Sequence, residues 1–81
     1  MKHRLRFTQI SKAAFCFFIN YDRERLDVDP LTIREQEKIW QRAKRHSPAA
    51  TDENICLALT PNEVAVIQRE GYKTKTRYIT I

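Results

Sequence analysis

Alternation of side chains at both ends of this 81-residue chain constrains its fold more than any other feature. In residues 2–7 and residues 72–81, side chains of one kind recur at every second position, which predicts a strand with two distinct faces at each end. The second of these segments is rich in threonine and tyrosine, which favours extended backbone further. The fold class therefore depends on what lies between the two strands.

A first helix start is expected between residues 29 and 33. Asp29 and Pro30 suit the cap and the first turn of a helix, and Thr32 with Glu35 offers an overlapping capping box. We expect this helix to end near His46, in a last turn crowded with cations. Its apolar stripe is narrow and consists of Ile33, Ile39, Trp40 and Ala43.

A second helix start follows the same chemistry. Thr60 with Glu63 forms a capping box, and the apolar spacing predicts a helix over residues 61–70. Gly71 suits the position after a helix end, where the backbone adopts a positive φ that glycine tolerates without steric cost.

Two further segments are ambiguous from the sequence. Residues 8–20 are apolar nearly all round and fit a helix capped by Thr8 better than a strand, although their aromatic content suits both. Residues 55–59 fit a buried strand better than a helical turn. The chain is too short for two domains, so the expectation is one α+β domain over residues 1–81. About three helices would pack on a small two- or three-stranded, mostly antiparallel sheet.

The net charge of +5 is concentrated at the two ends of the chain. Residues 1–14 carry +4 and residues 71–81 carry +3, without an acid in either segment, whereas the 56 residues between them carry −2. The cations share one face of each expected strand, and they are Lys2, Arg4 and Arg6 at one end and Lys73, Lys75 and Arg77 at the other.

These six cations carry the leading functional hypothesis. If the two strands were adjacent with their basic faces aligned, like charges would face each other, which is destabilising unless an anion such as nucleic-acid phosphate screens them. We therefore expect a non-enzymatic, small basic protein, accessory or regulatory, that binds DNA or RNA through these residues. Protection of edge strands against aggregation explains the same pattern without a ligand.

The alternative function is a protein-binding module, an inhibitor or adaptor, that docks on an acidic surface of a larger partner. Trp40 would be its anchor, because tryptophan and arginine are enriched at binding hot spots, and Arg42, Lys44 and Arg45 would contribute the cations. Burial of Trp40 in the core is the simpler interpretation of the same residue.

One segment resembles the register of a helix-turn-helix DNA-binding unit, in Ala58, Leu59, Thr60 and Val64. Two departures weaken the resemblance. Ala58 stands where that unit has its turn glycine, and Glu63 would set an acid against phosphate. A single capped helix that packs its apolar face into the core is therefore the favoured interpretation.

The patterns of catalytic, metal and cofactor sites do not occur in the sequence. Its histidines and cysteines are scattered, its single glycine cannot form a phosphate-cradling loop, and neither serine lies in a nucleophile elbow. We expect no enzymatic activity, no metal and no cofactor.

The residues around the two cysteines and the lengths of the apolar runs indicate the cellular compartment of the protein. Cys16 and Cys56 lie in apolar runs, which favours buried, reduced thiols in a cytoplasmic protein over a disulfide. The longest apolar run, residues 13–19, is far shorter than the roughly 20 residues of a membrane span, and polar residues follow it instead of a signal-peptide cleavage site.

Overall fold

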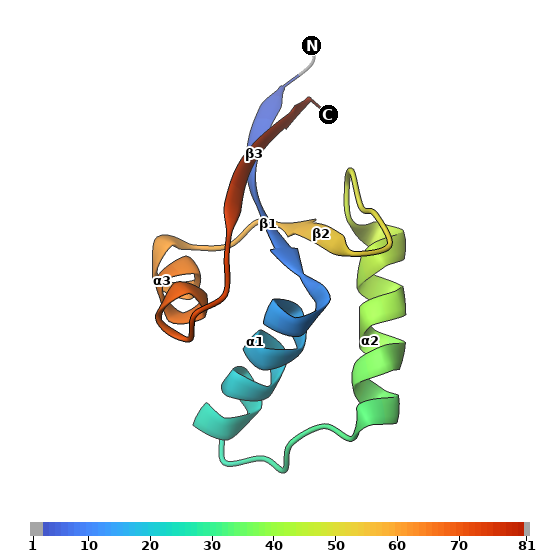
Figure 1. Ribbon diagram of the computed structural model, residues 1–81, viewed down its shortest axis with the longest axis vertical. Coiled ribbons are helices and arrows are strands. Elements are labelled where there is room, and N and C mark those ends of the chain that lie inside the picture. The colour runs from blue at the N-terminus through green and yellow to red at the C-terminus, as the bar shows by residue number, and fades with distance from the viewer. Residues whose placement is uncertain (1–2, 81) are drawn as a thin grey trace.

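The last strand of the chain pairs with the first in a three-stranded antiparallel sheet accompanied by three helices (Figure 1). The computed structural model describes residues 3–80. Its strand order is β2-β1-β3, so β1 lies between the other two strands. The elements are β1 (Arg4–Ser11), α1 (Lys12–Arg25), α2 (Ile33–His46), β2 (Asn54–Leu57), α3 (Pro61–Arg69) and β3 (Lys75–Thr80). The α+β fold class expected from the sequence is confirmed.

β1 continues four residues beyond the predicted strand end. It pairs with β2 through residues 8–11 and with β3 through residues 4–9, so ladders on both sides hold the backbone extended. Thr8, predicted to cap a helix, therefore lies inside the strand. Ser11 caps α1 instead, and its hydroxyl accepts a hydrogen bond from the Ala14 N–H at 3.2 Å.

α1 is the helix favoured over a strand for residues 8–20, and it runs on to Arg25, five residues beyond that segment. α2 begins at the Thr32–Glu35 capping box rather than at Asp29. The reason is tertiary, because the Asn20 side chain accepts a hydrogen bond from the Leu31 N–H at 3.0 Å and so holds the preceding residues outside the helix.

Residues 54–57 form a strand, as favoured, and α3 begins at the predicted Thr60–Glu63 capping box. Gly71 has a φ of +96° just after the helix, as its position predicted. Because a strand rather than a helix precedes α3, this segment is not a helix-turn-helix. β3 begins at Lys75, three residues later than expected.

The hydrophobic core takes residues from five of the six elements. Trp40 is 2% exposed, and its ring centroid lies 5.7 Å from that of Phe15. Ile33, expected in the buried stripe of α2, is 85% exposed because it begins the helix and points outward. β3 contributes none of the buried cluster, which consists of Ile10, Ala14, Phe15, Trp40, Ile55 and Ile67.

The outer edge of β2 is closed by a side chain. The Ser47 hydroxyl donates to the Cys56 carbonyl at 2.9 Å and accepts from the Cys56 N–H at 2.8 Å. Both hydrogen bonds that a further strand would make to this residue are thereby satisfied.

β1 and β3 form a ribbon that projects away from the helices, with the start of β1 and the end of β3 at its tip (Figure 1). We call residues 4–9 paired with residues 75–80 the β1–β3 ribbon. Residues 4–7 pair with β3 alone, so the outer part of the ribbon is two-stranded. The molecule is correspondingly elongated, with principal extents of 43, 24 and 20 Å.

Candidate nucleic-acid interface

The register of the β1–β3 ribbon decides how its cations are arranged. Arg6 stands opposite Tyr78, and Phe7 stands opposite Arg77. Directly opposite residues of an antiparallel pair lie on the same face, and neighbours along a strand lie on opposite faces. The two basic stripes are therefore adjacent but point to opposite faces. The structure does not gather the predicted cations on one surface, and no described cation of the ribbon stands opposite another.

The first face of the ribbon carries Arg4, Arg6 and Tyr78. The Arg4 guanidinium lies over the Tyr78 ring, 5.5 Å from its centroid, in a cation–π contact. The tyrosine is 59% exposed. This face thus presents two exposed arginines and a partly open aromatic ring.

The second face carries Lys75 and Arg77 on β3 and Phe7 and Gln9 on β1. Nη1 of Arg77 donates to Oε1 of Gln9 at 2.7 Å, which fixes the guanidinium against the sheet. Burial raises the pKa of the neighbouring Cys56 thiol, and the charge of Arg77 opposes that shift. Cys56 is thus a buried, protonated thiol, while Lys75 stays exposed.

Lys73 precedes β3 and extends the second face toward the body of the molecule. It lines a groove together with Lys75, Gln9, Asn54 and Tyr72. Lys75 and Arg77 therefore share one face, as the alternation predicted, and Lys73 lines the same groove as Lys75. Lys2, the sixth predicted cation, lies outside the described residues.

The residues predicted for a protein interface divide into two groups. Trp40 belongs to the core, so its indole is not available as an exposed anchor, and this part of the prediction is wrong. Lys44 pairs with Asp52 at 3.2 Å, within the chain itself. Only Arg42 and Arg45 are exposed as the interface hypothesis required.

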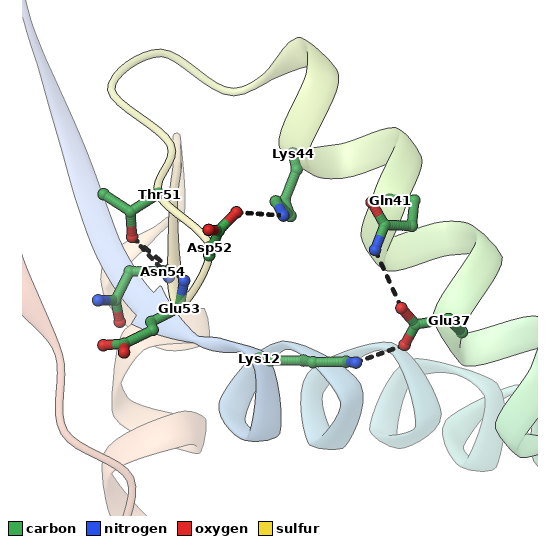
Figure 2. Close-up of polar contacts among 8 residues, drawn as sticks. All are labelled: Lys12, Glu37, Gln41, Lys44, Thr51, Asp52, Glu53 and Asn54. Atoms are coloured by element: carbon green, nitrogen blue, oxygen red, sulfur yellow. Dashed lines mark hydrogen bonds and ion pairs between the residues drawn. The ribbon is translucent and has the colours of Figure 1, made fainter.

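A polar network joins α2 to the rest of the molecule (Figure 2). Lys12, in the first turn of α1, donates to the Glu37 carboxylate, which also accepts from Nε2 of Gln41 at 3.0 Å. These hydrogen bonds, that of Lys12 first, hold the pKa of Glu37 below its ordinary value. In the following loop, Oγ1 of Thr51 accepts from the backbone N–H of residue 54 at 3.1 Å.

A second group of cations lies on α2, and two of them, Arg42 and Arg45, were expected from the sequence at a protein interface, without the group being connected as a row. All four side chains are exposed and lie on the side of the helix opposite Trp40. We call them the α2 row: Arg34, Lys38, Arg42 and Arg45. Their spacing of four, four and three residues was a visible signal. The row as a whole was not evident because the charge of the 56 central residues sums to −2.

Among residues 3–80, no three His, Cys, Asp or Glu side chains lie close enough together to hold a metal ion. No helix in this part of the chain is long and apolar enough to cross a membrane. Comparisons with protein-family models, curated proteins and solved structures find no match.

Proposed function

We propose that this chain is a non-enzymatic, cytoplasmic nucleic-acid-binding protein, accessory or regulatory in role, that inserts the β1–β3 ribbon into a groove of a duplex. The observation that carries the proposal is a projecting two-stranded ribbon with two described cations on each face and no acid. The major groove, about 12 Å wide, admits a two-stranded ribbon.

Cations on both faces suit a groove better than a flat surface, because a groove has a phosphate backbone on either side. Arg4 and Arg6 would contact one wall, and Lys75 and Arg77 the other, with Lys73 extending the second set. Tyr78 adds partly exposed aromatic surface beside the first set of cations, and Phe7 does so beside the second.

Edge protection explains less of this pattern. Both strands of the outer ribbon have an unpaired edge, so charge there does discourage further pairing. Charges of mixed sign would do the same and would add favourable cross-strand pairs. The restriction to one sign is what phosphate binding requires and edge protection does not.

The test is a fluorescence-anisotropy titration with a labelled duplex of about two helical turns, roughly 20 base pairs, and with its single strand. We expect the duplex to bind more tightly, and binding to weaken steeply between about 50 and 200 mM salt as counterions are released. No binding at low salt, or tighter binding of the single strand, would contradict groove insertion.

Paired variants separate the two faces. Arg4→Gln/Arg6→Gln and Lys75→Gln/Arg77→Gln should each reduce the slope of log affinity against log salt by about 1.8, at about 0.9 per phosphate contact. Arg25→Gln/Arg69→Gln removes the same charge elsewhere and is expected to leave the slope unchanged. A reduced slope in only one of the two ribbon variants would contradict groove insertion and would indicate that a single face docks on the duplex.

The alternative, docking on an acidic protein surface, rested on an exposed Trp40. Because that side chain fills the core, Trp40→Ala should reduce the free energy of unfolding by about 3–5 kcal/mol, rather than remove only partner capture. Urea unfolding measures this change. A Trp40→Ala variant as stable as the wild type would restore the alternative.

A further inference from the structure

The outward side of α2 departs from the usual pattern of a solvated helix. The four cations of the α2 row follow one another along about 16 Å of helix, at 1.5 Å per residue. Like charges four residues apart destabilise a helix, whereas a Glu four residues before a Lys stabilises it. The row places Arg34 four residues before Lys38, and Lys38 four residues before Arg42.

In the described part of the chain, the acids of the helix form no ion pair with the row, although the charge of Lys38 contributes, after the Thr32 hydrogen bonds, to lowering the pKa of Glu35. Glu35 closes the capping box by accepting from the Thr32 N–H at 2.9 Å. Glu37 is bound by Lys12 and Gln41 on the side that faces α1 (Figure 2). Among residues 3–80, no ion pair involves a member of the row.

The composition of this surface discriminates between two kinds of partner. Protein interfaces have a core that is depleted of charge and enriched in aromatic residues, and the α2 row has no apolar member. Contacts to a phosphate backbone are electrostatic and need no apolar burial. Over the length of the row, one strand of a duplex presents about five phosphates, at about 3.4 Å each.

We propose that the α2 row is a second phosphate-binding surface, which holds a nucleic-acid segment separate from the one that receives the ribbon. This inference rests on the proposed function of the ribbon. The two surfaces belong to different parts of the molecule, because the ribbon projects from one end while α2 lies along its side (Figure 1). We expect a duplex seated on the ribbon to leave the row free, so that one chain joins two segments.

Stoichiometry with short duplexes of about one helical turn, roughly 10 base pairs, tests the inference. Native mass spectrometry in duplex excess should show two duplexes per wild-type chain. Arg34→Gln/Lys38→Gln/Arg42→Gln/Arg45→Gln should bind one duplex, and the ribbon variant Arg4→Gln/Arg6→Gln/Lys75→Gln/Arg77→Gln should also bind one. Arg25→Gln/Arg69→Gln removes half as much charge at other positions, is a partial control for lost charge, and should bind two.

The outcomes separate this inference from the function on which it rests. A wild-type chain that saturates with one duplex, and loses it only in the ribbon variant, overturns the second surface and leaves the proposed function standing. A wild-type chain that binds none overturns both. Capture of poly-L-glutamate through the row, with duplex stoichiometry unchanged in the row variant, would assign this surface to an acidic polypeptide and also overturn the inference.

Discussion

Ser47 is a single side chain that completes a sheet edge. Its hydroxyl makes both backbone hydrogen bonds of Cys56, a residue that is 2% exposed. Ser47→Ala leaves a buried N–H and C=O without partners, so we expect the free energy of unfolding to fall by about 1–3 kcal/mol. Urea denaturation measures this change. Asp52→Ala, which removes only the solvent-exposed pair with Lys44, should change stability by under about 1 kcal/mol.

Ala49 has a φ of +53°, in the left-handed region that side chains disfavour. Ala49→Gly relieves this strain of about 1–2 kcal/mol. Part of that gain is offset because glycine has more conformational entropy in the unfolded chain. We expect a net stabilisation of about 0.5–1 kcal/mol, measured by thermal unfolding. Ala50→Gly, at a residue packed against the core, is the matched control and should destabilise. Equal effects at both positions would contradict this explanation.

At the scale of elements, α2 depends on two carboxylates. The Thr32 backbone and the Lys12 side chain are the main causes that hold the pKa values of Glu35 and Glu37 below the ordinary 4.5. Because the folded pKa values lie below the unfolded ones, this stabilisation is complete above about pH 4.5 and is lost as pH falls through the folded values.

We therefore expect the free energy of unfolding to decline with acidification below pH 4.5, and Glu37→Gln to flatten part of that decline. Chemical denaturation at a series of pH values measures it. Both carboxylates are exposed, so the difference between the two proteins should shrink at about 1 M salt, where charges are screened within about 3 Å. An identical acid profile for wild type and Glu37→Gln would refute the role of this network.

The elements differ in how far the sequence predicts them, and the difference follows from locality. The capping boxes at Thr32 and Thr60 involve residues three apart, so they were readable directly. Thr8 and Asp29 had equally good capping chemistry, but strand pairing and the Asn20 side chain overrode it. Local propensity therefore located helices, while tertiary contacts set their starts.

The candidate site shows the same division. Which cations share a face of one strand followed from alternation, as Lys75 and Arg77 show. Whether the two stripes lie on the same face depends on the pairing register between residues more than 60 positions apart. The sequence of one strand alone does not determine this register. The sequence therefore predicted the residues of the ribbon but not their division between two faces.

At the scale of the whole molecule, stability is expected to be uneven. β3 contributes nothing to the buried cluster, and residues 4–7 pair with β3 alone. Amide hydrogen exchange should therefore be fast in residues 4–7 and 77–80 and slow in residues 8 and 9, which pair on both sides. Addition of duplex should slow exchange in the ribbon. Uniform exchange along β1 would contradict this picture.

The position of the ribbon ends also determines how the molecule responds to mechanical load. Arg4 and Thr80 face each other at the tip (Figure 1). A pull applied between these two positions acts on one interstrand pair at a time, so the strands peel apart from the tip inward. The same strands pulled along their length would share the load over all their pairs. Tension across this tip should therefore open the proposed binding surface while the helices and the buried cluster are still intact.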